Sequence, residues 1–380
     1  MQPARATNGW RAASSIDELA LLADTAGAVV VGHALQRLET PNPATYVGKG
    51  KLEEIKSRAD EFDVVIFDDE LSPSQQRNLE NALGVKVLDR AALILDIFAM
   101  RARTREGRLQ VELAQSEYLL PRLRGQWSHL ERLSARSGAP GAIGVRGPGE
   151  TQIETDRRLV RRRIQKLKQD IEDVRKQRAL YRRQRERQGV PVVALVGYTN
   201  AGKSTLMRAL TRDDEVFVQD RLFATLDPLT RRIRLDHAHT ALLTDTVGFI
   251  QKLPTTLVAA FRATLEELAD ATVLLHVVDI THPDAALQSQ TVEDTLADLG
   301  LSDKPRLTAL NKIDQLHDAD GNTPKSESEL AYFQASLALN LPDAVLISAD
   351  KRWGLDALRA RLIEMIDREQ ALLRGAATPA

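Results

Sequence analysis

A buried strand that runs straight into a glycine-rich loop and then into a helix constrains this chain more than any other feature. The strand is VPVVALVG at 190–197, the loop is GYTNAGKS at 197–204, and TLMRAL continues the helix. Loops with the spacing G-x-x-x-x-G-K-[ST] wrap backbone N–H groups around a phosphate, and the helix dipole adds to the attraction. The sequence therefore predicts an α/β domain with a doubly wound sheet and a phosphate-binding loop, within residues 189–368.

Two further features predict a phosphate and metal site on the same sheet. We expect Lys203 to bridge the β- and γ-phosphates of a nucleotide and the Ser204 hydroxyl to ligate Mg²⁺. The strand ALLTDTVGFI at 241–250 carries the pattern Asp-x-x-Gly. We expect Asp245 to hold the Mg²⁺ ion, usually through water, and the Gly248 N–H to contact the γ-phosphate.

A third motif selects the base. The strand RLTALNKID ends in Asn-Lys-x-Asp, and the strand AVLISAD carries Ser348 and Ala349. A carboxylate accepts hydrogen bonds from N1–H and the 2-amino group of guanine, whereas adenine offers neither and leaves the carboxylate unpaired. We expect Asp314 to recognise guanine, Asn311 to brace the loop and the Lys312 stem to cover the ring. The backbone at Ser348 and Ala349 is expected to meet guanine O6.

The rest of the chain divides into an N-terminal α/β part and a helical part. Residues 15–100 alternate strands and helices, which is typical of a small parallel α/β domain. Residues 101–188 predict a helical hairpin. We expect residues 1–14 to be a disordered N-terminus and residues 369–380 to be a frayed tail.

The composition excludes several classes of protein. The chain has no cysteine, which excludes disulfides, Cys-ligated zinc, iron–sulfur clusters and thiol nucleophiles. No apolar stretch reaches about 18 residues, so we expect no transmembrane helix. The N-terminal residues lack the apolar segment of a secretory signal. We therefore expect a cytoplasmic protein.

Local signals place several elements in the N-terminal part. Ser15 and Glu18 have the spacing of a capping box at a helix start, and Ser72 followed by Pro73 marks another helix start. The expected strands are 27–32, 63–67 and 85–89.

The turn YVGKGK at 46–51 precedes a predicted helix at 50–59. Glycines before a helix N-terminus can hold a phosphate. Because the turn lacks the GKS or GKT ending, we favour a plain loop or an RNA contact over a second nucleotide site.

Two long helices with matching apolar seams are predicted in the helical part. Apolar residues, including Trp127, recur every three or four positions from about 107 to 133, and the same spacing continues from about 152 to 188. Such seams pack against each other, here as an antiparallel hairpin. The glycine- and proline-rich stretch 137–150 cannot form a helix or a regular strand. It is either a disordered connector or a loop at the hairpin tip that orders against a large partner.

The hairpin is strongly basic. Residues 101–188 contain 23 Lys or Arg and 11 Asp or Glu, whereas the whole chain has a net charge of −1. A basic block in an otherwise acidic chain favours contact with nucleic acid over a merely solvated helical face. The cations expected on the outer face of the second helix are Arg157, Arg158, Arg161, Arg162, Arg163, Lys166, Lys168, Arg182, Arg183 and Arg185.

The order of these motifs resembles a translation-factor-related GTPase domain, and other segments narrow the resemblance. FATLDPLTRRI at 223–233, RGPGETQIETDRR at 146–158 and the pattern ADTAGA…YVGKGKLEE make residues 15–370 similar to the HflX family of ribosome-associated GTPases, in the Obg–HflX group. The resemblance implies binding of GTP, GDP and Mg²⁺ and hydrolysis of GTP to GDP and phosphate. It also implies that the basic hairpin binds the RNA of the large ribosomal subunit, and a role in splitting or rescuing stalled ribosomes under stress.

The resemblance completes the candidate site. Thr225 in FATLD matches the switch threonine that reaches Mg²⁺ in the GTP state. The expected catalytic residues are then Lys203, Thr225 and Gly248, and the expected Mg²⁺ ligands are Ser204, Thr225 and Asp245. The nucleotide-binding set is Gly197, Tyr198, Thr199, Asn200, Ala201, Gly202, Lys203, Ser204, Thr205, Phe223, Thr225, Asp245, Gly248, Asn311, Lys312, Asp314, Ser348 and Ala349.

Two positions bear on the rate of hydrolysis. Many GTPases place glutamine directly after Asp-x-x-Gly to orient the attacking water. Here the residue is Phe249, whose ring cannot hydrogen-bond water in that role, so we expect slow hydrolysis until another component completes the site. Asn200 matches an asparagine that helps some related GTPases to bind K⁺ beside the phosphates, where a cation would neutralise transition-state charge. The alternative is an asparagine that only braces the loop.

Two classes of function remain. The first is a monomeric GTPase that docks its hairpin onto ribosomal RNA and is stimulated by the ribosome. The second is a GTP-dependent regulatory protein or RNA-modification helper that acts away from the ribosome. The basic hairpin and the family resemblance favour the first.

Overall fold

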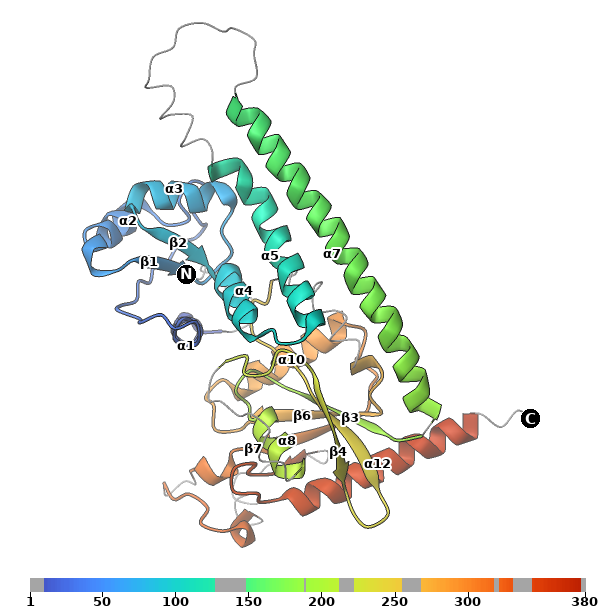
Figure 1. Cartoon of the computed structure of the whole chain (residues 1–380). Coiled ribbons are helices and arrows are strands. Elements are labelled where there is room, and N and C mark those ends of the chain that lie inside the picture. The colour runs from blue at the N-terminus through green and yellow to red at the C-terminus, as the bar shows by residue number, and fades with distance from the viewer. Residues whose placement is uncertain are drawn as a thin grey trace, which may run out of the picture. The chain divides into compact units, whose positions relative to one another are not determined.

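The computed structural model describes residues 10–126, 148–187, 189–211, 222–254, 268–317, 321–330 and 344–376. The chain forms two compact units, Met1–Gln177 with Pro254–Ala260, and Arg178–Leu253 with Phe261–Ala380 (Figure 1). Across the described ranges, no helix is at once long enough and apolar enough to cross a membrane.

The first unit begins with the small α/β part. Strands β1 and β2 pair in parallel, with Val64 opposite Lys86, and buried side chains such as Leu79 and Val87 pack between the sheet and α3. As predicted, Ser72 caps α3. It does so in a capping box, in which Ser72 Oγ accepts a hydrogen bond from the Gln75 N–H at 3.2 Å. The elements are α1 (Ala12–Thr25), α2 (Lys49–Lys56), η1 (Ala59–Glu61), β1 (Val64–Phe67), α3 (Pro73–Leu83), β2 (Lys86–Asp89) and α4 (Arg90–Arg101).

A buried polar network links α1 to the residues that follow β1 and β2. Arg90 forms ion pairs with Glu18 and, at 2.7 Å, with Asp68. Ser15 Oγ donates to Asp68 at 2.6 Å, and Ser15 lies inside α1 instead of capping it.

The prediction that residues 1–14 are disordered is wrong for residues 10–14. Trp10 is buried and α1 begins at Ala12. Residues 1–9 lie outside the described chain.

The predicted strand at 27–32 is wrong. These residues are all described and form no strand, and Val29 is 87% exposed. Helix α1 ends in a Schellman motif: the Ala28 N–H bonds Ala23 O, and Gly27, with φ of 85°, donates to Asp24 O. The apolar run predicted a strand because β-branched residues suit a sheet surface. In the described part of the chain, however, β1 and β2 pair only with each other.

The basic hairpin is formed by α5 (Arg105–Gln126) and α7 (Pro148–Arg187), which run in opposite directions (Figure 1). The predicted seams meet, because Leu113 of α5 packs with Leu167 and neighbouring apolar residues of α7. Helix α7 starts at Pro148, so the last three residues of the predicted loop 137–150 are helical, and proline suits a first helical position. The rest of that loop and the last part of the first predicted helix, from residue 127, lie outside the described residues.

Two predicted outer-face cations are wrongly placed. Arg163 pairs with Glu112 of α5 at 2.5 Å, and Lys168 pairs with Glu117 at 2.8 Å. Acids on α5 thus draw these two side chains toward the partner helix. The side chains of residues 179–187, which include Arg182, Arg183 and Arg185, are not described.

The second unit is the predicted doubly wound α/β domain. Its described strands form a six-stranded sheet in the order β4-β5-β3-β6-β7-β8, parallel except for the edge strand β4. The elements are β3 (Val192–Val196), α8 (Lys203–Thr211), β4 (Leu229–Arg234), β5 (Thr240–Asp245), β6 (Val273–Asp279), α10 (Ala285–Asp298), β7 (Arg306–Asn311), η2 (Ile313–Gln315), η3 (Glu327–Glu329), β8 (Ala344–Leu346) and α12 (Leu355–Ala376).

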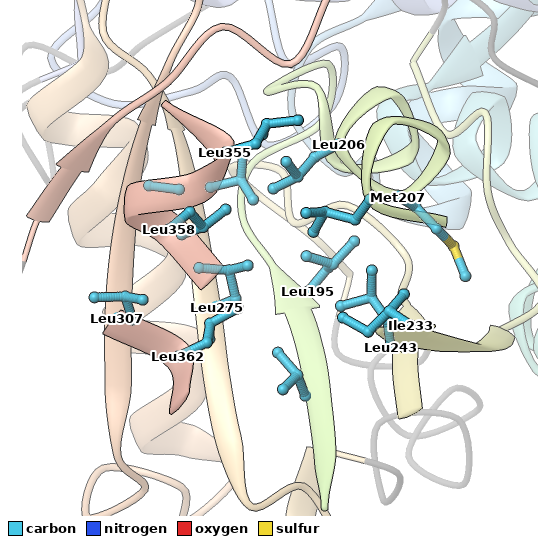
Figure 2. Packing of buried hydrophobic residues seen from close by; sticks show 14 of the residues in the cluster. Leu195, Leu206, Met207, Ile233, Leu243, Leu275, Leu307, Leu355, Leu358 and Leu362 are labelled. Atoms are coloured by element: carbon cyan, nitrogen blue, oxygen red, sulfur yellow. The ribbon is translucent and has the colours of Figure 1, made fainter. Parts of the chain in front are cut away.

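Helices cover both faces of this sheet. Figure 2 shows Leu206 of α8 and Leu358 of α12 packed with Leu195 and Leu275 of the strands on one face. On the other face, Val278 of β6 packs with the start of α10. Helix α12 continues to Ala376, so the predicted frayed tail 369–380 is wrong over its first eight residues.

Candidate nucleotide-binding site

A buried lysine lies under the loop that joins β3 to α8. Lys203 is 6% exposed, and its Nζ donates to the carbonyl oxygens of Gly197 at 3.0 Å and Tyr198 at 2.7 Å. Burial lowers the pKa of Lys203 to about 8, and the charge of Asp245 opposes that effect. An anion placed at the loop would offset the cost of burying this ammonium.

The Asp-x-x-Gly segment lies directly against this loop. The Thr199 N–H donates to Phe249 O at 2.8 Å, and the Phe249 N–H donates to Gly197 O at 3.1 Å. A Cβ on Gly248 would lie 2.8 Å from Thr199 Cα and 3.0 Å from Lys203 Nζ. Only glycine therefore fits between the two segments.

One contact in this region was not predicted. The Tyr198 hydroxyl accepts a hydrogen bond from the Gln251 N–H at 2.9 Å, which ties the loop to the residues after Asp-x-x-Gly. Both side chains are buried. Nothing in the sequence pairs these two positions, because the contact depends on how the two segments meet.

Three oxygen-bearing side chains converge beside Lys203. Ser204 Oγ donates to Asp245 Oδ2 at 2.7 Å, Thr225 Oγ1 donates to the same oxygen at 2.9 Å, and the two hydroxyls are 2.8 Å apart. Burial raises the pKa of Asp245. Its other oxygen, Oδ1, is buried and has no hydrogen-bond partner in the described structure.

This trio fits a magnesium ion. Mg²⁺ takes oxygen ligands and keeps several waters, and a cation would satisfy the buried carboxylate oxygen that the chain itself leaves unpaired. The hydroxyls of Ser204 and Thr225 and the carboxylate of Asp245 are the ligands that the sequence predicted. The structure brings all three together.

Most of the predicted phosphate-side residues line one pocket. Gly197, Tyr198, Ala201 and Asp245 lie behind its surface, whereas Asn200 is exposed at its rim with φ of 61°. The lining consists of Thr199, Asn200, Gly202, Lys203, Ser204, Thr205, Phe223, Ala224, Thr225, Thr246 and Gly248.

Asn311 connects the base-side residues to the phosphate loop. Its Nδ2 donates to Ala201 O at 2.8 Å, and its Oδ1 accepts from the Ala349 N–H at 3.0 Å. The asparagine thus braces both loops from the end of β7. A Cβ on Gly202, which has φ of 96°, would collide with Asn311 Nδ2.

The other base-side residues surround this brace. Lys312 has a left-handed φ of 65°, and its Nζ pairs with Asp279 at 2.7 Å, a partner that the sequence analysis missed. Asp314 lies half-buried in η2, and its carboxylate has no hydrogen bond or ion pair with any described residue. Ser348 is fully buried, and its Oγ accepts from the Lys351 N–H at 3.1 Å.

Phe249 is a structural residue. Its side chain is 2% exposed, and its backbone forms the two hydrogen bonds to the phosphate loop described above. The side chain that follows Asp-x-x-Gly therefore packs in the protein interior. Residues 212–221 and 255–267, which flank these segments in the sequence, lie outside the described chain.

Comparisons with known proteins identify the family of this chain. Family models match at residues 13–99 (GTP-binding GTPase N-terminal), 101–185 (GTP-binding GTPase Middle Region) and 192–312 (50S ribosome-binding GTPase). A GTPase HflX of Caldanaerobacter subterraneus subsp. tengcongensis is 49% identical over 357 residues, which are 93% of this chain and 77% of the relative. The chain belongs to the HflX family of GTPases.

The GTPase HflX of Escherichia coli K12 is 44% identical over 358 residues, 94% of this chain and 80% of the relative. A crystal structure of a GTP-binding protein from Sulfolobus solfataricus in complex with GDP is 28% identical, covers 93% of this chain and 95% of that one, and has a TM-score of 0.45. This HflX chain contains the domain that binds GTP and hydrolyses it to GDP and phosphate.

Proposed function

We propose that this HflX protein binds GTP across the sheet edge between the phosphate loop and η2, and that the large ribosomal subunit stimulates its hydrolysis. Lys203 and the loop N–H groups bind the phosphates, and the Gly248 N–H contacts the γ-phosphate. Asp314, which has no partner among the described residues, binds guanine N1–H and the 2-amino group. Lys312, held by Asp279, covers the ring.

Mg²⁺ is held by Ser204, Thr225 and Asp245, and the unpaired Asp245 Oδ1 supports this assignment. When bound, the ion neutralises charge on the β- and γ-phosphates. Thr225 ties the switch segment 223–227 to this centre through its hydrogen bond to Asp245 and its contact with Ser204. Asn200 is placed at the pocket rim, where a bound K⁺ ion would lie beside the phosphates.

The observation that supports an RNA partner is a stripe of unpaired cations on α7. Arg158, Arg162 and Lys166 are exposed and follow one another at intervals of four residues, with Arg161 beside them. Residues at such intervals share one helix face. None of these four side chains forms an ion pair within the described ranges, whereas Arg163 and Lys168 are neutralised by α5 acids. We refer to Arg158, Arg161, Arg162 and Lys166 as the cation stripe.

A row of unpaired cations is costly to a folded helix, because like charges repel each other at intervals of four residues. Phosphates of an RNA backbone would relieve that repulsion and release counterions. We therefore assign the cation stripe to the RNA of the large ribosomal subunit. In the GTP state the protein splits or rescues stalled ribosomes under stress, as a cytoplasmic monomer.

The test compares two triple variants on the same helix. Changing Arg158, Arg162 and Lys166 to Gln removes three unpaired charges. Changing Arg163, Lys168 and Arg175 to Gln removes three ion-paired charges of the same kinds. Both are sedimented with purified large subunits and a non-hydrolysable GTP analogue over a salt series.

The stripe variant should bind at least tenfold more weakly, and its slope of log affinity against log salt should be shallower by about 3. The control variant should keep the wild-type slope. Equal effects of the two variants would move the RNA contact elsewhere. Full-length wild-type protein that never sediments with subunits would favour a regulatory or RNA-modification role away from the ribosome.

A further inference from the structure

One buried hydroxyl in the phosphate pocket has no partner. Thr199 is 6% exposed, its Oγ1 is buried, and this atom makes no hydrogen bond in the described part of the protein. Burying a hydroxyl without a partner costs free energy, and such groups are rare in folded proteins. A ligand that bonds to the hydroxyl would remove that cost.

The position of Thr199 indicates which part of a ligand this is. Thr199 lines the same pocket as Lys203, Ser204, Thr225 and Gly248. It lies against Gly248, whose Cβ, if present, would be 2.9 Å from Thr199 Cγ2. Its backbone N–H is held by Phe249 O at 2.8 Å, so the residue is fixed at the junction of the two segments expected to enclose the γ-phosphate.

A second unpaired atom supports the same conclusion. Asp245 Oδ1 belongs to the trio beside this pocket, and the proposed Mg²⁺ accounts for it. The Thr199 hydroxyl takes no part in the hydrogen bonds of the trio, so we assign it a ligand group other than the Mg²⁺ ion. The neighbouring hydroxyl of Thr246, which also lines the pocket, is already bonded to Leu195 O at 2.6 Å.

We propose that the Thr199 hydroxyl orients the water that attacks the γ-phosphate of GTP, the task that Phe249 cannot perform. The proposal rests on GTP binding in this pocket. The hydroxyl accepts a hydrogen bond from the water and donates one to a γ-phosphate oxygen, and it keeps its own proton throughout. It holds the water by position, without acting as a base.

The step balances without any other reactant. The water oxygen forms a bond to the γ-phosphorus, and the bond from this phosphorus to the oxygen bridging the β-phosphate breaks. The electron pair of the broken bond leaves with GDP, and the proton lost by the water ends on the released phosphate. Thr199 is unchanged at the end of the cycle.

The substitution Thr199→Val distinguishes a threonine that orients water from one that serves only packing. Valine has the same shape without the hydroxyl, so Thr199→Val removes the unpaired group and should leave the melting temperature of the nucleotide-free protein equal or higher. If Thr199 serves only packing, kcat should also be unchanged. If it orients water, kcat falls while the protein remains stable.

The experiment measures kcat, KM, GDP affinity and melting temperature for Thr199→Val, Thr199→Ser and Thr25→Val. Thr199→Val should lose at least tenfold in kcat, with GDP affinity within about twofold of wild type. Thr199→Ser keeps a hydroxyl and should retain most of kcat. Thr25→Val is the matched control, because Thr25 is as buried as Thr199 but does not line the pocket. It loses a satisfied bond to Leu21 O and should melt at a lower temperature, with kcat within about threefold of wild type.

A Thr199→Val protein with wild-type kcat, or a Thr199→Ser protein as slow as Thr199→Val, would overturn the role of this hydroxyl. If the nucleotide does not bind in this pocket at all, the result is different. Lys203→Ala would then bind GDP as tightly as wild type, whatever the kcat values of the Thr199 variants.

Discussion

Lys203 should make nucleotide affinity depend on pH just above neutrality. Its ammonium is buried under the phosphate loop, and burial lowers its pKa to about 8. Bound phosphates stabilise the charged form, so nucleotide binding raises this pKa again and takes up a proton. Affinity is therefore full near pH 7 and declines as the pH rises through 8.

The size of the effect follows from the pKa. With a value of about 8 in the free protein, roughly nine-tenths of Lys203 is protonated at pH 7 and about one quarter at pH 8.5. GDP affinity should then fall about fourfold between these two pH values. The stability of the nucleotide-free protein changes in the other direction. The unfolded chain keeps this proton up to a pKa of 10.5, so the Lys203 contribution to stability increases from pH 8 to 10.5 and is lost as the pH falls through 8.

The assay is titration with a fluorescent GDP analogue from pH 7.0 to 9.0, together with calorimetry in two buffers of different ionisation enthalpy to count protons taken up. Lys203→Ala serves as the control, because ionisation of the nucleotide itself affects both proteins equally. Lys203→Ala should bind GDP more weakly than wild type, and its affinity should change with pH only through the ionisation of the nucleotide. Parallel curves for wild type and Lys203→Ala would refute the role given to the buried ammonium.

Three substitutions test other parts of the structure. Asn311→Ala breaks both bonds of the buried brace and leaves Ala201 O and the Ala349 N–H unpaired, so it should cost about 2–5 kcal/mol of unfolding free energy, measured by chemical denaturation. Asp314→Asn should weaken GTP binding and increase binding of xanthosine triphosphate, which a competition assay measures. Leu167→Ala in the fully buried hairpin seam should cost about 2–5 kcal/mol, measured by denaturation of the full chain.

Exposed counterparts provide the controls for these substitutions. Asn78→Ala removes one exposed bond to Ala44 O, and Leu159→Ala removes an exposed leucine of α7. Each should cost less than about 1 kcal/mol. An Asn311 or Leu167 variant no less stable than its control would contradict the packing described here, and an unchanged preference for guanine would contradict the role of Asp314.

Patterns local in the sequence predicted much of the fold. The phosphate loop, the Asp-x-x-Gly strand and the hairpin seams depend on spacing along one segment, and each forms where it was expected. The helix start predicted at Ser72 and Pro73 formed for the same reason. Ser204 and Asp245 meet because their motifs follow the neighbouring parallel strands β3 and β5, whereas Thr225 was expected from the family resemblance alone.

Features that depend on distant partners were not predictable. Ser15 has the spacing of a helix cap but lies inside α1, because Asp68, far along the chain, takes its hydroxyl. The valines at 27–32 suit a strand but have no partner strand in the described structure. Arg163 and Lys168 belong to a basic helix, yet acids on α5 determine where their side chains point.

The most direct test of the central claim is steady-state release of phosphate from GTP with and without purified large ribosomal subunits, in K⁺ and in Na⁺. Because Phe249 is buried where many GTPases carry glutamine, we expect slow hydrolysis by the isolated protein. The subunits should raise the rate at least tenfold, about 1.4 kcal/mol off the barrier. A higher rate in K⁺ than in Na⁺ is expected if Asn200 helps to hold a cation. Equal rates in the two salts would remove only that role, whereas equal rates with and without subunits would contradict ribosome-stimulated hydrolysis.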